Sequence, residues 1–161
     1  MIDYKWFAQR RKGRNCMENY VIRRITTNDY HDIHELNLKL GYAYDEEKVA
    51  ERIQNILDAG IDLILVAELE GKVVGYVHGT PYGTLYSDNL VSIIQMVFTN
   101  ETRENKEMTS EIIKEFEKVV KRNGYHGIRM AADIDRKVLY EIMMENGYEN
   151  KRDLKHYIKY F

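Results

Sequence analysis

The chain has 161 residues, of which 44% are hydrophobic, and a formal net charge of −2 at neutral pH. This length and composition are typical of one soluble domain with a sizeable core. No run reaches the roughly 18 apolar residues of a transmembrane helix, and the first residues lack the apolar core of a signal peptide, so we expect a cytoplasmic protein without a membrane anchor. The single cysteine, Cys16, excludes an internal disulfide. No cysteine–histidine cluster has the spacing of a zinc site, so we expect no metal.

The first 19 residues concentrate positive charge. They hold five basic residues and two acidic ones, a net charge of +3, which leaves −5 for the rest of the chain. We therefore divide the chain into a flexible basic arm (1–19) and a single domain (20–161). A basic arm can bind nucleic acid, but five charges make few phosphate contacts and the acidic remainder argues against nucleic acid as a partner. The simpler interpretation is a leader before a domain that starts near Met17.

The first half of the domain contains the pattern of one strand, two helices and a hairpin. Residues 20–25 indicate a strand. Apolar residues at helical spacing predict one helix that ends at Gly41 and a second, from about residue 45, that ends at Gly60. Two apolar runs, 61–69 and 72–79, are separated only by Glu70 and Gly71, a spacing that indicates a tight hairpin.

The second half alternates strands with helices. Pro81 and Gly83 mark a loop, and an apolar strand follows at 90–98. A polar turn then leads into a strongly amphipathic helix that starts near Met108 and ends at Asn123-Gly124. Residues 127–133 predict another strand and 136–146 a short helix. The tail, 153–161, alternates apolar and polar residues, which predicts a closing strand.

The turn between the strand at 90–98 and the amphipathic helix has the form of an anion site. The first N–H groups of a helix lack internal partners and lie at its positive end, so a phosphate is the first ligand to consider there. The order of elements predicts an α/β (α+β mixed-sheet) fold. We expect a largely antiparallel sheet with one parallel junction and helices on both faces.

Four segments in this order resemble the GNAT superfamily of acyl-CoA-dependent N-acetyltransferases, over residues 20–161. They are LNLKLGYAYDEEKVAERI, LVAELEGKVVGYVHG, IIQMVFTNETRENKEMTSEIIKEF, and RNGYHGIRM followed by RKVLYEIMMENGYE. The resemblance implies direct transfer of an acetyl group from acetyl-CoA, as co-substrate and without a metal, to the amine of a small molecule or, less readily, of a protein. It leaves a monomer and a homodimer equally open.

The resemblance also implies where acetyl-CoA binds. The backbone of Met96, Val97 and Phe98 would hold the pantetheine and acetyl arms, and backbone contacts need no particular side chain. The following loop usually reads Arg/Gln-x-x-Gly-x-Gly/Ala in the family, because glycines let N–H groups approach the pyrophosphate. Arg103 matches the first position of that pattern.

The two glycines of the loop pattern are missing from this chain. Lys106 and Met108 stand in their places. Lys106 can offer a positive charge to phosphate, and Thr109 and Ser110 can offer hydroxyl donors. The altered loop leaves an alternative open, in which the protein is a catalytically degenerate GNAT-like module that binds CoA or a protein partner without turnover.

Candidates for proton transfer follow from the same resemblance. The tyrosine that reprotonates the thiolate in many relatives falls on Met143, and Tyr140 lies one turn earlier as a candidate or as a packing residue. For the general base we consider His78, Gln95 and Asp88, of which only His78 has an ordinary pKa near neutrality. A structural histidine and a water-relayed base are the alternatives.

The loop at 78–89 is the expected lip of the acceptor pocket, because loops on a rigid sheet carry specificity. It contains Tyr82, Tyr86 and Asp88. Aromatic rings and a carboxylate suit an amine through cation–π and ionic contacts. Ordinary packing at a sheet edge is the alternative interpretation of these residues.

Overall fold

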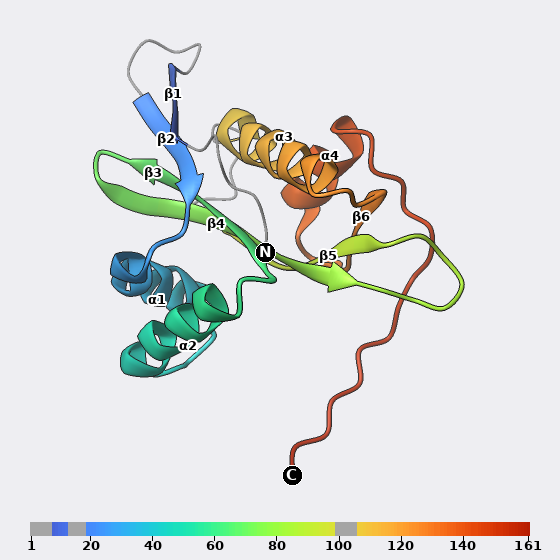
Figure 1. Cartoon of the computed structure of the whole chain (residues 1–161), viewed down its shortest axis with the longest axis horizontal. Helices are drawn as coiled ribbons and strands as arrows, with labels where there is room; N and C mark the ends of the chain where they lie inside the picture. The colour runs from blue at the N-terminus through green and yellow to red at the C-terminus, as the bar shows by residue number, and fades with distance from the viewer. Residues whose placement is uncertain (1–7, 13–18, 99–105) are drawn as a thin grey trace.

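The computed structural model describes residues 8–12, 19–98 and 106–161. These residues form a six-stranded sheet in the order β1-β2-β3-β4-β5-β6, in which only β5 and β6 are parallel (Figure 1). The predicted mixed sheet with one parallel junction is confirmed. The strands are β1 (Ala8–Lys12), β2 (Asn19–Arg24), β3 (Leu63–Leu69), β4 (Lys72–Tyr82), β5 (Leu90–Phe98) and β6 (Gly127–Met130).

Helices cover both faces of the sheet, as the sequence predicts (Figure 1). One face carries α1 (Tyr30–Lys39), preceded by a 3-10 turn η1 (Thr27–Asp29), and α2 (Glu46–Ala59); the other carries α3 (Lys106–Arg122) and α4 (Lys137–Glu145). Each pair of helices closes its own apolar cluster against the sheet. Because both faces are covered, β3 is buried on both sides and is a continuous apolar run rather than an alternating one.

The hairpin between β3 and β4 forms where the sequence predicts it. Glu70 has a φ of 51° and Gly71 a φ of 80°. Two adjacent positive φ values give a turn whose twist matches that of the flanking strands, and a glycine at the second position removes most of the strain. β3 and β4 then pair from Leu69–Lys72 back to Leu63–Gly79.

The structure corrects the expected outline at both ends of the chain. Residues 8–12, assigned to the flexible arm, form β1 and pair with β2 along the edge of the sheet. The tail expected as a closing strand has no regular secondary structure and is exposed over residues 149–161. Figure 1 shows it running away from the sheet. An alternating pattern makes a strand only where a partner strand accepts its hydrogen bonds, and the tail pairs with none of the described strands.

Three boundaries inside the chain also differ. β4 continues through Pro81, which was expected in a loop, because beyond Gly79 one edge of β4 has no partner in β3 and a residue without an N–H is tolerated there. β6 ends at Met130 instead of Asp133. α3 begins two residues before Met108. Among the described residues, no helix has the length and apolar character needed to cross a membrane.

Candidate functional site

Over the second half of β5, the edge that faces β6 pairs with no strand of the described residues, and we call this unpaired stretch the open edge of β5. The parallel ladder joins Leu90–Ile93 to Gly127–Met130 and stops there, whereas β5 continues to Phe98. Successive residues of a strand direct their N–H and C=O groups to opposite edges. Those of Met96 and Phe98 therefore point away from β4, on an edge that no other described strand covers. An opening of this kind presents backbone donors and acceptors to a ligand.

One side chain reaches into this opening from the chain that follows β6. Arg136, immediately before α4, donates a hydrogen bond of 2.7 Å from its Nη2 to the carbonyl oxygen of Met96. The contact confirms that the Met96 peptide group faces the opening. It also ties the start of α4 to β5 beyond the end of the parallel ladder.

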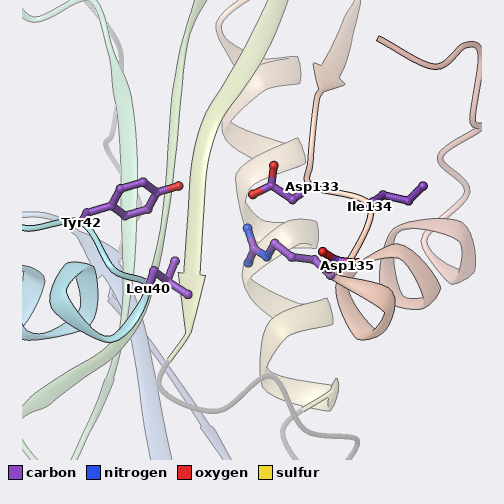
Figure 2. A pocket seen from close by; sticks show the side chains of 6 residues that line it. Leu40, Tyr42, Asp133, Ile134 and Asp135 are labelled. Carbon is purple, nitrogen blue, oxygen red and sulfur yellow. The ribbon is translucent and has the colours of Figure 1, made fainter. Parts of the chain in front are cut away.

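A pocket of about 340 Å³ lies beside this opening. Figure 2 shows Leu40 and Tyr42, from the end of α1 and the turn after it, on one side, and Asp133, Ile134 and Asp135, from the loop between β6 and α4, on the other. Arg136 completes the lining. The pocket therefore combines an aromatic ring with two carboxylates and a guanidinium group, contributed by segments about ninety residues apart in the chain.

A hydrogen-bonded network connects α1 to the sheet on the face that α1 and α2 cover. The Tyr76 hydroxyl donates to Asn37 Oδ1 at 2.6 Å, and Gln95 Nε2 donates to the same oxygen at 3.2 Å. Burial and the nearby Tyr42 raise the pKa of the Tyr76 hydroxyl, outweighing the opposite effects of Asn37 and Arg136. Tyr76 thus remains a protonated donor. Two of the residues that act on it, Tyr42 and Arg136, also line the pocket.

His78 lies on the same face, opposite Gln95 in the β4–β5 register. Its Nε2 is 2.9 Å from Asp62 Oδ2, and both side chains are largely buried. A carboxylate on one ring nitrogen fixes the orientation of an imidazole. The structure thus brings two sequence candidates, His78 and Gln95, together on one face and supplies a partner, Asp62, that the sequence analysis did not name.

The residues expected at the pyrophosphate are tied to α4. Lys106, at the start of α3, forms an ion pair of 2.5 Å with Glu145, and Ser110 donates a 3.0 Å hydrogen bond to Asn146 Oδ1. Both contacts join the first turns of α3 to the end of α4, so this helix start is held in a defined place. Arg103 lies outside the described residues.

The other side chains expected at the cofactor are buried or, for Met108, partly buried. Thr109 is 3% exposed, and Met108 packs against the cluster under α3 and α4. On β5 the side chains of Met96 and Phe98 enter that cluster, whereas the side chain of Val97 enters the cluster under α1 and α2. Their side chains therefore serve the two cores, which leaves the backbone as the part of β5 that faces the opening.

The remaining candidates lie at the surface. Tyr140, on α4, is 54% exposed, while Met143, on the same helix, is buried. The Tyr82 ring packs under the Arg129 guanidinium, 4.3 Å from its centroid. Tyr86 is 85% exposed and Asp88 is also exposed, and neither lines the pocket.

Sequence reasoning named none of the residues that line the pocket. A signal for one group exists, because Asp133-Ile134-Asp135-Arg136 is a polar segment at the carboxyl end of a parallel strand, where ligands of α/β sheets commonly bind. Asn37, Tyr42 and Tyr76 carry no comparable signal, since their positions relative to β5 follow from the packing of α1 on the sheet.

Solved structures of low sequence identity share the fold. An aminoglycoside N-acetyltransferase, AAC(6')-Iy, in complex with CoA has a TM-score of 0.75 at 13% identity, covering 88% of this chain and 95% of that one. Glucosamine-6-phosphate N-acetyltransferase from Arabidopsis thaliana has a TM-score of 0.72 at 21% identity, with 88% and 98% covered. The aminoglycoside acetyltransferase meta-AAC0020, from an uncultured soil metagenomic sample and in complex with sisomicin, has a TM-score of 0.69 at 19% identity, with 88% and 96% covered.

No curated protein sequence matches the chain. A family model described as Acetyltransferase (GNAT) family matches residues 27–142, which include both helices of the α1–α2 face, β3 to β6 and α3. The matched segment contains the open edge of β5, Arg136 and the whole pocket lining. The chain belongs to the GNAT acetyltransferase family.

Proposed function

We propose that the protein transfers an acetyl group from acetyl-CoA to the amine of a small molecule by direct attack. One observation carries the proposal: the open edge of β5 at Met96 lies beside a pocket that holds two carboxylates and an aromatic ring. A thioester site and an amine site must adjoin for direct transfer, because the catalytic advantage comes from holding the two reactants together. Family membership and CoA-complexed structural neighbours support the donor.

The residues on the donor side fit a CoA thioester. The N–H groups of Met96 and Phe98 lie on the open edge, where a backbone donor can stabilise the charge that develops on a thioester oxygen. The first N–H groups of α3 lie at the positive end of the helix, with Lys106 and Ser110 in its first turns. Arg103 and the half-buried Met108 complete the proposed contacts with the cofactor.

The residues on the acceptor side fit a cation. Asp133 and Asp135 attract an ammonium group, and the Tyr42 ring adds a cation–π surface. We propose that an amine with one or more positive charges binds there. The expected lip residues Tyr82, Tyr86 and Asp88 would contact only an acceptor that extends beyond the pocket.

Proton transfer needs a base for the ammonium group and an acid for the thiolate. We propose His78 as the base that takes the proton of the acceptor, oriented by Asp62, with Gln95 beside it across the strand pair as a hydrogen-bonding group for the acceptor. We retain Tyr140 as the acid, because its exposed side chain lies on α4, the helix whose N-cap is Arg136.

Calorimetric titration with acetyl-CoA is the first test, with desulfo-CoA and ADP as controls. Micromolar binding of acetyl-CoA and desulfo-CoA, with much weaker binding of ADP, supports a site that holds both the pantetheine and the pyrophosphate. A panel of mono- and polyamines, followed by detection of free thiol, then identifies the acceptor. No heat and no thermal shift at millimolar acetyl-CoA contradicts the proposal.

A second function is favoured by the contacts at the start of α3. The ion pair of Lys106 with Glu145 and the hydrogen bond of Ser110 to Asn146 engage the groups that would meet phosphate. A binding module without turnover would retain such contacts. It predicts saturable CoA binding with no acetyl transfer to any amine of the panel, so turnover of one amine excludes it.

A further inference from the structure

Arg136 engages the backbone group that an acyl-CoA would need. Its guanidinium is 2.7 Å from the Met96 carbonyl oxygen, on the open edge of β5, and Met96 is 1% exposed. A buried carbonyl requires a donor, and Arg136 supplies it. Any ligand that runs along this edge meets the guanidinium first.

The proposed donor site and this contact compete for the same space, because a pantetheine arm within hydrogen-bonding distance of β5 would lie where the guanidinium lies. The amide N–H groups of a pantetheine arm along β5 would donate to the same carbonyl from the same side of the strand. Exchanging one donor for another leaves the carbonyl satisfied, so the exchange does not carry the large penalty of an orphaned buried group. The displaced guanidinium also keeps anionic neighbours, because Asp133 and Asp135 line the same pocket.

We propose that Arg136 is a latch that closes the acyl-CoA site of the free protein and that acyl-CoA must displace it to bind. This inference rests on the proposed function, since it concerns regulation of that site. When only a fraction of the molecules is open, the apparent affinity falls by that fraction. The latch therefore lowers the affinity for acetyl-CoA while it adds a contact to the free protein, and removal of the side chain should change these two properties in opposite directions.

The test compares Arg136→Met with Lys137→Met. Both substitutions remove one positive charge with a similar change in volume, but Lys137 is exposed on the first turn of α4 and lines no part of the pocket. The dissociation constant of acetyl-CoA is measured by calorimetry, and the free energy of unfolding without ligand by urea denaturation. We expect Arg136→Met to bind acetyl-CoA about tenfold more tightly, equivalent to about 1.4 kcal/mol, and to unfold more easily. Lys137→Met should change neither property appreciably.

Each other result contradicts the latch in an identifiable way. Weaker binding by Arg136→Met means that the arginine contacts the ligand directly, and unchanged binding with lower stability means that it only fastens α4 to β5. Arg136→Lys covers the case in which Arg136→Met does not fold: a lysine has fewer donors, and we expect it to tighten binding by a few fold. If wild type and variants all fail to bind at millimolar ligand, the proposed function fails together with the latch. If wild type binds and neither variant binds more tightly, the latch alone fails.

Discussion

Lys106 is the single residue on which the proposed phosphate contact depends most. It stands where the family pattern has a glycine, and its ammonium group meets Glu145 at 2.5 Å and Glu141 at 4.0 Å. We expect Lys106→Glu to weaken acetyl-CoA binding by tenfold or more, about 1.4 kcal/mol, because it replaces an attraction for phosphate with a repulsion. Calorimetric titration of the variant measures the effect.

Lys114→Glu is the matched control for that substitution. Lys114 lies on the same helix, is exposed, and pairs with Glu111 at 3.3 Å. The same reversal of charge there should leave the affinity for acetyl-CoA within about twofold, because a surface pair contributes little and the helix start is far along the axis. Equal losses in the two variants would show a general effect of charge and remove Lys106 from the site.

Asp29 is a buried carboxylate that controls stability rather than chemistry. Burial by itself would raise its pKa, but hydrogen bonds from Arg23 and from the Thr26 N–H outweigh burial and lower the pKa below the ordinary value of 3.8. A carboxylate whose pKa is lower in the folded than in the unfolded protein stabilises the fold above its ordinary pKa. That contribution is lost as the pH falls through the folded-state pKa.

Asp29→Asn should therefore destabilise the protein by roughly 2 kcal/mol near neutral pH, the usual size for hydrogen bonds to a charged group. The difference in the free energy of unfolding between Asp29→Asn and wild type should shrink as the pH is lowered through and below 3.8, because both proteins then lack the charge. Urea denaturation at a series of pH values measures it. Asp45→Asn, at an exposed pair with Lys48, is the control, and a difference that stays constant with pH would contradict the assignment.

At the scale of the elements, α3 packs closely over Gly79 of β4. A Cβ atom at this position would lie 2.5 Å from the Phe116 ring and 2.7 Å from a Val91 methyl group. Gly79→Ala must push α3 and β5 apart, and such overpacking costs about 1–3 kcal/mol. We expect a loss of that size in the free energy of unfolding.

Gly83→Ala, directly after the end of β4, is the control substitution. Its added Cβ would meet only Asn89 Oδ1, at 3.8 Å, so stability should change little. Equal effects of the two substitutions would show that the glycines act through backbone freedom and not through the approach of α3. The close contact matters for the site, because α3 carries the helix start proposed to bind phosphate and β5 carries the open edge.

At the scale of the whole molecule, two apolar clusters hold the sheet from opposite faces, and the proposed site lies where β5 and β6 separate between them. A ligand that binds there contacts α3, β5 and the start of α4 together. At about a hundredfold excess over its dissociation constant, acetyl-CoA should add about 2.7 kcal/mol to the stability of the folded protein. For a chain of this size, that raises Tm by roughly 5–10 °C.

Differential scanning fluorimetry with acetyl-CoA and ADP checks this expectation. ADP lacks the pantetheine arm, so at equal concentration it should raise Tm much less. Equal shifts for the two ligands would show that the nucleotide end alone is bound and that the edge of β5 plays no part.

Most elements of the fold could be predicted because their signals are local. The apolar spacing of α3, the glycine after α2 and the Glu70–Gly71 hairpin each lie within a short window of sequence, and each is found in the structure. Predictions failed where the outcome depended on a partner. The charged segment of β1 is a strand because it pairs with the edge of β2, whereas the alternating tail pairs with none of the described strands and has no regular structure.

The sequence pattern was sufficient for the mixed sheet and the position of the helix start after β5, since these follow from the periodicity and order of consecutive residues. The family was reached through the resemblance of four segments, and the family model confirms it. The pocket and the contact of Arg136 with β5 followed only from the tertiary structure. Tyr42 and Asp133 line one pocket, and Arg136 reaches the Met96 carbonyl, because α1 packs against β4 and β5 while the segment after β6 comes back to β5. Contacts between segments this distant are set by the path of the chain through space, which no local pattern of residues records.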